Sequence, residues 1–250
     1  MAAQPDIRIS SDDQWADSAA QLIQEITEQT ARSQSHIFIA LSGGSTPRRL
    51  YQTLTASRWN RGLPWQHMVF FFGDERCVPP DHPESNYGMA RAALFRPLDI
   101  DSRRIHRMKG EREDAASAAR EYEETLRAVT KCSAPMIPQL DLVLLGLGDD
   151  GHTASLFPGA PELHEPTALI TVSHSPKGIT RRLTVTLGVI NRASVILFLV
   201  TGSAKAQTLR RVLEPRTDTD RQLPATLVKP DHGRLIWQLD QSAASALSDM

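Results

Sequence analysis

The feature that most constrains the fold is a series of short apolar runs, each separated from the next by a stretch with helical character. The runs at 36–41 (HIFIAL), 68–72 (MVFFF), 142–145 (LVLL) and 195–200 (VILFLV) have no alternating polar positions. Continuous apolar runs of this length are typical of strands buried on both faces. Because helices separate the strands regularly, we expect an α/β fold with three layers and a mostly parallel sheet.

Length and composition are those of an ordinary globular protein. The chain has 250 residues, of which 40% are hydrophobic and 23% charged, and this size is compatible with one large α/β domain. We find no internal repeat, low-complexity tract or linker. The sequence therefore predicts a single domain over residues 1–250.

Charge and cysteine usage exclude several classes of function. The net charge of −1 does not favour a nucleic-acid or membrane-surface partner, and no apolar run approaches the roughly 18 residues of a membrane span. The N-terminus lacks a secretory signal pattern. Two cysteines, Cys77 and Cys132, make neither a disulfide framework nor a four-thiolate metal site. We expect a cytoplasmic protein without a bound metal.

The turn after the run at 36–41 has the composition of a phosphate-binding loop. It reads Ser42, Gly43, Gly44, Ser45, Thr46, and Pro47 then suits the start of a helix over 47–56. Glycines let the backbone approach a ligand, and hydroxyls with free amides at a helix start hold phosphate. The same residues also suit a simple tight turn. Because no Gly-Lys-Ser/Thr of a P-loop is present, a sugar phosphate or another monophosphate is the expected ligand.

The turn after the run at 68–72 is Gly73, Asp74, Glu75, Arg76. In the functional interpretation, Asp74 binds substrate hydroxyls and Arg76 lies near an anion. In the alternative, the turn is solvated and Arg76 forms a surface ion pair that contributes about 0–1 kcal/mol.

The segment after the run at 142–145 is the strongest candidate for chemistry. Asp149, Asp150, Gly151 and His152 follow the predicted strand, at the edge of the sheet where α/β folds bind ligands. An imidazole is a general base near neutral pH, and a carboxylate two residues away can orient its ring. An isolated histidine is more often structural, but we expect this one to begin a helix beside Asp150.

The same segment contains a dinucleotide fingerprint, which we reject. Gly146, Gly148 and Gly151 spell G-x-G-x-x-G after a strand. The two aspartates inside the turn would repel a pyrophosphate, and the next predicted strand, 169–172, does not end in the acidic residue that binds ribose. We therefore expect no NAD and no other cofactor.

Two further basic positions stand near strand ends. Arg181 and Arg182 precede the run at 183–187, and Lys205 follows the run at 195–200, in the first turn of a predicted helix. A lysine there opposes the helix dipole, which favours anions at a helix start. We expect Lys205 to bind phosphate.

These motifs together resemble those of the 6-phosphogluconolactonases, a group that shares a fold with glucosamine-6-phosphate deaminase. The resemblance covers nearly the whole chain, in the family's order and approximate spacing. It implies a Rossmann-like core, no metal cofactor, and hydrolysis of 6-phospho-D-glucono-1,5-lactone to 6-phosphogluconate in the oxidative pentose phosphate pathway. The matching blocks are LSGGSTPRRLY, FFGDERCVPPDHPESNYGMA, LDLVLLGLGDDGHTASLFPG, RRLTVTLGVINRASVILFLVTGSAKA and LPATLV.

The resemblance also implies roles for particular residues. His152 of the DGH motif resembles the family's general base, and Asp150 either orients His152 or binds substrate. Asp74 and Arg76 match the family's DER motif, and the 42–47 loop matches its phosphate-side loop. Arg182 fits the arginine before the Leu-Thr-Val-Thr strand better than Arg181 does, and a slip of one residue stays open. Lys205 matches the lysine of the G-x-x-K-A element.

One position separates the two branches of the family. The deaminases carry a glutamate five residues after the DGH histidine, where this chain has Phe157, which favours the lactonase branch. The alternatives are an amino-sugar-phosphate isomerase or deaminase and a non-catalytic sugar-phosphate-binding protein.

Attack of water on the lactone carbonyl would form a tetrahedral oxyanion. Backbone amides of the glycine-rich turns or Arg76 would stabilise this oxyanion. The sequence leaves the oligomeric state open, as a monomer or a small homo-oligomer.

Overall fold

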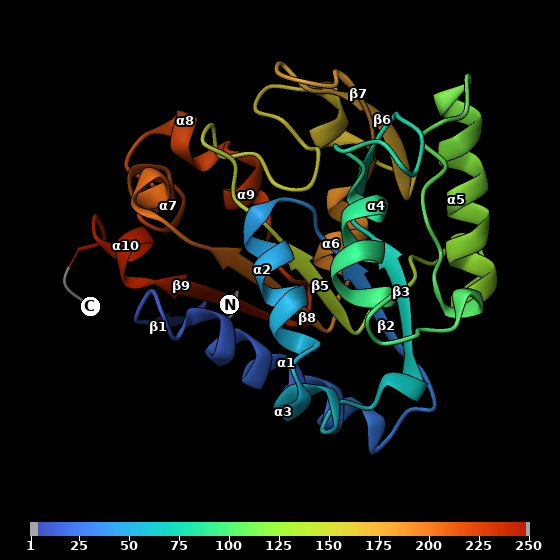
Figure 1. The fold of residues 1–250 in the computed structure, drawn as a ribbon. Coiled ribbons are helices and arrows are strands. Elements are labelled where there is room, and N and C mark those ends of the chain that lie inside the picture. Colours follow the sequence, from blue (N-terminus) through green and yellow to red (C-terminus); the bar gives the residue numbers. More distant parts are fainter. Residues whose placement is uncertain (1–4, 249–250) are drawn as a thin grey trace.

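A computed structural model, which describes residues 5–248, contains a six-stranded sheet in which every neighbouring pair of strands is parallel (Figure 1). The predicted mostly parallel α/β fold is confirmed, and the four apolar runs all lie in this sheet. In spatial order the strands are β1 (Asp6–Ser10), β9 (Arg234–Asp240), β8 (Val195–Val200), β5 (Leu142–Leu145), β2 (Ile37–Leu41) and β3 (Met68–Phe72).

Both faces of this sheet are buried, which explains why its strands lack polar alternation. In β5, Leu142 and Leu144 pack on one side, and Val143 and Leu145 pack on the other, as the period of two requires. The first side is covered by α1 (Trp15–Ala31), α2 (Ser45–Leu54) and α4 (Asn86–Ala90). The second side is covered by α5 (Ala115–Thr130), α6 (Leu187–Asn191), α7 (Ala206–Leu213), α9 (Pro224–Leu227) and α10 (Gln241–Ala244).

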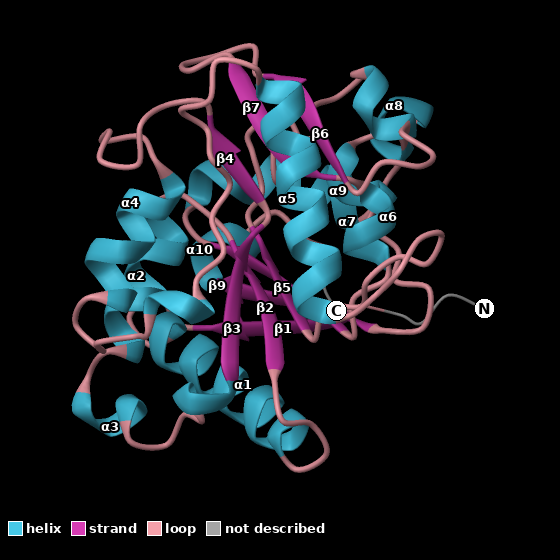
Figure 2. Cartoon of the chain, turned by 90° about the vertical axis from the view of Figure 1, so that its right-hand side faces the viewer, coloured by secondary structure: helices cyan, strands magenta, loops and turns pink. Residues whose placement is uncertain are grey.

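A second, antiparallel sheet was not expected from the sequence. It contains β4 (Asp74–Arg76), β7 (Arg181–Val185) and β6 (Ile170–His174), and Figure 2 shows it set apart from the parallel strands. The predicted strand at 169–172 and the run at 183–187 therefore lie outside the main sheet, which a single mostly parallel sheet would have included. These two segments form a hairpin with each other, and β7 pairs with β4 directly after β3 ends.

The start of α2 differs from the sequence prediction. Helix α2 begins at Ser45, two residues before Pro47, and Gly44 precedes it with φ +103°. Glycine adopts this conformation without strain. The remaining short α-helices of the described residues are α3 (Ser57–Asn60) and α8 (Asp218–Arg221). Within residues 5–248, no helix combines the length and the apolar character needed to cross a membrane.

Candidate active site

Most of the predicted site residues line one cavity at the carboxyl ends of the parallel strands. The cavity has a volume of about 250 Å³, and the antiparallel sheet contributes to it through β4. Strands β2, β5 and β8 each end beside it. Its lining includes Ser42, Gly43 and Gly44 after β2, Asp74 and Arg76 of β4, His152 after β5, and Lys205 after β8.

Two smaller groups of predicted residues line adjoining cavities. Ser45 and Thr46 line a cavity of about 140 Å³ together with Lys205. Arg182 lines another, of about 400 Å³, together with Ser45 and Arg76. Gly44 lines all three cavities, so the start of α2 is their common point.

The His152 ring is held by Asp150. One oxygen of Asp150 (Oδ1) lies 2.6 Å from His152 Nδ1 and also accepts a hydrogen bond of 3.0 Å from the His152 backbone N–H. Burial raises the pKa of Asp150. The hydrogen bonds from His152 and the nearby imidazole lower it by more, so the pKa lies below its ordinary value. Asp150 is therefore a charged partner for the ring, and the other ring nitrogen stays available to a substrate or water.

The backbone around His152 is shaped to accept the ring. Gly148 lies so close that a Cβ atom there would be 2.0 Å from His152 Nδ1, and its N–H donates to the His152 carbonyl at 2.9 Å. On another side, the ring of Phe157 packs against the imidazole with centroids 4.8 Å apart. Gly148, one of the three glycines of the apparent dinucleotide fingerprint, thus makes room for this histidine.

The expectation that His152 begins a helix is wrong. The segment from 149 to 157 consists of turns, and Ala154 within it has φ +48°. This left-handed conformation is uncommon for residues other than glycine. Because no helix starts here, the segment also lacks the helix terminus on which a dinucleotide pyrophosphate would bind.

Asp74 is fixed by two residues that the sequence analysis did not identify. Its carboxylate is 6% exposed and accepts hydrogen bonds from Asn86 Nδ2 at 3.1 Å and from Ser155 Oγ at 2.7 Å. Asn86 packs so closely on Gly43 that a Cβ there would overlap its amide. Asn86 begins α4 and Ser155 lies in the turn after His152. Only the three-dimensional structure reveals their contact with Asp74.

Glu75, between Asp74 and Arg76 of the DER motif, has a structural role. Its buried carboxylate accepts hydrogen bonds from the backbone N–H groups of Arg76, Asn86 and Tyr87 and from the Ser85 hydroxyl. Burial raises its pKa despite these donors. Glu75 therefore joins β4 to the start of α4.

Arg76 and Arg182 are directly opposite each other on the antiparallel strands β4 and β7. Arg182 is 8% exposed, and burial together with the neighbouring Arg76 charge lowers the pKa of its guanidinium. Arg76 Nε is buried without a hydrogen-bond partner among residues 5–248. Like charges opposite each other destabilise a sheet, so this pair favours a bound anion. Arg181, by contrast, is exposed and lines none of the three cavities.

Lys205 lies on the other side of the start of α2. It belongs to the turn Ser203–Lys205 that precedes α7, rather than to the first turn of a longer helix. Its ammonium is 2.5 Å from Asp149 Oδ1. At the start of α2 itself, the first intrahelical bond is donated by Arg48 to Gly44 at 3.1 Å, so the amides of Ser45 and Thr46 precede the hydrogen-bonded helix.

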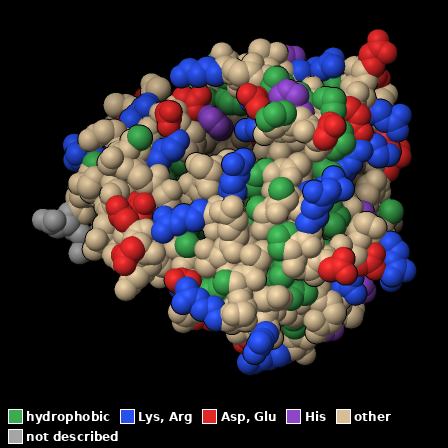
Figure 3. Space-filling view, viewed as in Figure 1, with side chains coloured by type: hydrophobic (Ala, Val, Ile, Leu, Met, Phe, Trp, Pro, Cys, Tyr) green, Lys and Arg blue, Asp and Glu red, His purple; other side chains and the backbone are tan. Residues whose placement is uncertain are grey.

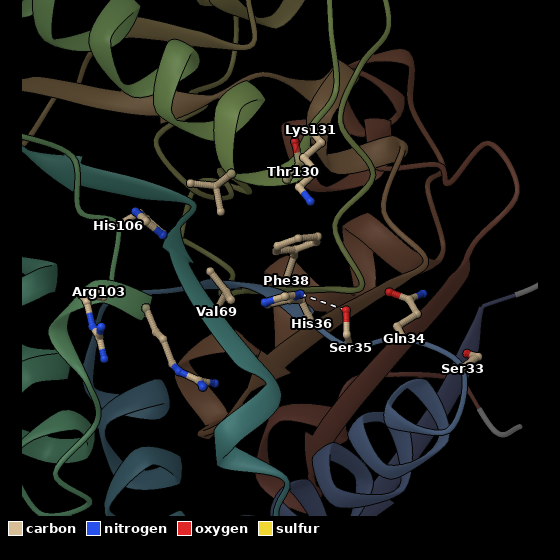
Figure 4. Close-up of a pocket in the computed structure, with 12 residues that line it drawn as sticks. Ser33, Gln34, Ser35, His36, Phe38, Val69, Arg103, His106, Thr130 and Lys131 are labelled. Carbon is tan, nitrogen blue, oxygen red and sulfur yellow. Dashed lines mark hydrogen bonds between the residues drawn. The ribbon is translucent and has the colours of Figure 1, made fainter.

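The surface around these cavities is hollowed, and Lys and Arg side chains gather at the hollow (Figure 3). Among the described residues, no three His, Cys, Asp or Glu side chains are grouped as a metal site would require. A larger cavity, of about 620 Å³, lies at the opposite, amino ends of β2 and β3 (Figure 4). It is lined by residues such as His36, Phe38 and His106 and includes none of the predicted site residues.

Two known proteins with similar sequences are 6-phosphogluconolactonases. The chain is 45% identical over 209 residues to a 6-phosphogluconolactonase of Synechocystis, with 84% of each chain covered. It is 37% identical over 251 residues to the human 6-phosphogluconolactonase, with 96% of this chain and 92% of that one covered.

Solved structures show the same fold. The 6-phosphogluconolactonase of Trypanosoma brucei superposes with a TM-score of 0.87 at 29% identity, covering 98% of this chain and 99% of that one. A monomeric glucosamine-6-phosphate deaminase, at 21% identity and a TM-score of 0.79 over 96% of this chain and 99% of that one, shares the fold. The family model for glucosamine-6-phosphate isomerases/6-phosphogluconolactonase matches residues 10–237. The chain therefore belongs to the glucosamine-6-phosphate isomerase/6-phosphogluconolactonase family.

Proposed function

We propose that this protein is a 6-phosphogluconolactonase, which hydrolyses 6-phospho-D-glucono-1,5-lactone to 6-phospho-D-gluconate in the oxidative pentose phosphate pathway. The relatives that are 45% and 37% identical carry this name. The observation that carries the proposal is that His152, whose ring is held by Asp150, lines the same cavity as Arg76 and Gly44. It combines a base with groups that bind anions.

In the proposed reaction, His152 is the general base. Its Nδ1 faces Asp150, so Nε2 takes a proton from water, and the resulting hydroxide attacks the lactone carbonyl carbon. The tetrahedral intermediate then collapses, and the C1–O bond to the ring oxygen breaks. The imidazolium returns its proton to that oxygen, which becomes the hydroxyl of the product. Asp150 stabilises the imidazolium during this exchange.

The charge of the tetrahedral intermediate needs donors in the same cavity as His152. The backbone of Gly43 and Gly44 and the guanidinium of Arg76 line that cavity, and both kinds of donor stabilise an oxyanion when they are positioned in advance. Asp74, fixed by Asn86 and Ser155, accepts hydrogen bonds from the sugar hydroxyls.

The phosphate binds at the start of α2. Gly44 and Ser45 stand there between Arg182 on one side and Lys205 on the other, and the helix dipole adds a favourable field for an anion. This binding energy is remote from the ester bond, and it holds the carbonyl carbon in reach of His152.

The structure gives no reason to favour the deaminase alternative. Phe157 occupies the position at which the deaminases carry a glutamate, and its apolar ring packs on His152. A phenylalanine cannot exchange protons with the histidine during ring opening of an amino sugar.

The test is hydrolysis of freshly prepared 6-phosphogluconolactone at low temperature, with the spontaneous rate subtracted. We expect His152→Gln to lower kcat by roughly 10²–10⁴-fold, the usual contribution of a general base, while circular dichroism shows an intact fold. The exposed His164 provides the matched control, His164→Gln, which should keep the full rate. A His152→Gln protein with nearly full activity would exclude His152 as the base. A wild-type protein that binds 6-phosphogluconate without turning over the lactone would instead be a sugar-phosphate-binding protein.

A further inference from the structure

The cavity beside Arg182 holds more positive charge than the sequence motifs predict. In addition to Arg76 and Arg182, it is lined by Arg48 of α2 and by Lys177, which no motif singled out. Glu84 is the single carboxylate among the described residues that line it. A whole chain with a net charge of −1 thus concentrates four cationic side chains around one cavity.

Lys177 lies on the turn that joins β6 and β7, and the backbone of this turn is fixed. Ser175, which is 7% exposed, donates its hydroxyl to the Lys177 carbonyl at 2.7 Å and accepts from the Lys177 N–H at 3.3 Å. The Ser175 N–H donates to the Thr180 carbonyl at 2.7 Å, and Gly178 has φ +66°. The turn therefore holds the base of the lysine in place, while its side chain is exposed.

The charge of Lys177 acts on both sides of the start of α2. On one side, Lys177 lines the cavity of Arg76 and Arg182. On the other, its charge helps to lower the pKa of Asp149, a smaller effect than that of Lys205, which contacts Asp149 directly. Within residues 5–248, Lys177 forms no ion pair with an acidic side chain of its own. Its ammonium is thus free to bind an anion that reaches the start of α2.

We propose that Lys177 is a specificity-determining residue that binds the phosphate of the substrate. This rests on the proposed function of the site. A phosphate carries between one and two negative charges near neutral pH, and a lysine contacts it as a point charge on a flexible stem. Arg76 and Arg182 are held by the sheet, whereas the Lys177 side chain closes on the phosphate from the exposed side of the cavity. Lys177 therefore raises the preference for phosphorylated lactones over unphosphorylated ones.

The first experiment compares Lys177→Ala with the wild type on 6-phosphogluconolactone and on unphosphorylated glucono-1,5-lactone. We expect KM for the phosphorylated lactone to rise about 10-fold, the usual effect of losing one charge-assisted hydrogen bond. We expect kcat to change by less than about 2-fold and hydrolysis of the unphosphorylated lactone to stay the same. Lys177→Arg should restore most of the loss, and Lys229→Ala, at an exposed lysine away from these cavities, is the matched control.

A second measurement separates this proposal from the proposed function. Calorimetry of 6-phosphogluconate and of inorganic phosphate reports binding whether or not the protein turns over the lactone, so it decides the role of Lys177 even if the wild type is inactive. Weaker binding of both ligands to Lys177→Ala, with an unchanged melting temperature, supports the proposal. Equal KM changes for the two lactones, or unchanged binding of 6-phosphogluconate, would overturn it.

Discussion

At the scale of single residues, the position of the imidazole depends on the absence of a side chain opposite it. A Cβ atom at Gly148 would lie 2.0 Å from His152 Nδ1, whereas a Cβ at Gly146 would meet its nearest neighbour, Ser42 Oγ, at 3.8 Å. The first distance is a severe overlap, and the second is an ordinary van der Waals contact. The two glycines of one short turn therefore differ sharply in how much space they offer.

We predict that Gly148→Ala lowers kcat for 6-phosphogluconolactone by at least 10-fold, because the methyl group displaces the ring from Asp150 and misplaced groups lose catalysis steeply. Gly146→Ala is the control and should keep kcat within about 2-fold. Lactone hydrolysis and thermal unfolding of both variants check this. Equal losses in the two variants would show that the turn tolerates no alanine at all, and the specific role of Gly148 would be wrong.

The candidate site residues predicted from the sequence adjoin strands of the sheets. His152, Asp74, Arg76 and Lys205 each stand in a glycine-containing segment at the carboxyl end of a buried run, and Arg182 directly precedes an apolar one. Asn86 at the start of α4, and Ser155 and Lys177 in turns, stand in local sequence that gave no reason to assign them a role. They reach the site because the folded chain brings distant segments together, such as Ser155 and Asp74, which are 81 positions apart. A single sequence carries no local signal for such contacts.

At the scale of elements, the start of α4 is attached to β4 through one carboxylate. Glu75 accepts hydrogen bonds from the N–H groups of Asn86 and Tyr87 and from the Ser85 hydroxyl. Ser85 and Asn86 are buried, and a buried donor that loses its partner is costly. Since Asn86 in turn holds Asp74, the attachment of α4 also supports the active site.

We predict that Glu75→Ala lowers the free energy of unfolding by about 3 kcal/mol, because several buried donors lose a charged acceptor. Urea unfolding followed by circular dichroism measures this. Glu113→Ala, at an exposed glutamate, should leave the unfolding midpoint unchanged. A Glu75→Ala protein as stable as the wild type would mean that α4 does not need this attachment.

The antiparallel sheet marks the limit of prediction at this scale. Apolar runs predicted β2, β3, β5 and β8, because both faces of those strands are buried. The segment of β4 has only three residues, all charged, and therefore carries no apolar signal. Without β4, nothing in the sequence shows that β7 pairs outside the main sheet.

At the scale of the whole molecule, the active site lies where the two sheets meet. The N–H of Val185 in β7 donates to the carbonyl of Gly73, directly after β3, and the N–H of Gly73 donates to the carbonyl of Leu41 at the end of β2. Such continuous bonding favours one cooperative unit over two separate ones. We propose accordingly that residues 1–250 form a single domain.

We predict that urea unfolds this protein in a single transition, with the same midpoint by tryptophan fluorescence and by far-ultraviolet circular dichroism. The tryptophans report on the layers around the parallel sheet, since Trp15 and Trp237 are buried there, whereas circular dichroism reports on all helices and strands. Midpoints that differ between the two probes would reveal a second, separately unfolding unit.

The acidic turn after β5 also bears on how the product leaves. In the proposed reaction, hydrolysis does not change the phosphate, so the cationic cavity would hold 6-phosphogluconate by the same contacts that hold the lactone. The difference arises at the other end, where a neutral ester becomes a carboxylate beside the turn of Asp149 and Asp150. Like charges that lie close together repel each other. If His152 is the base, as proposed, the aspartates beside it therefore also weaken the binding of the product.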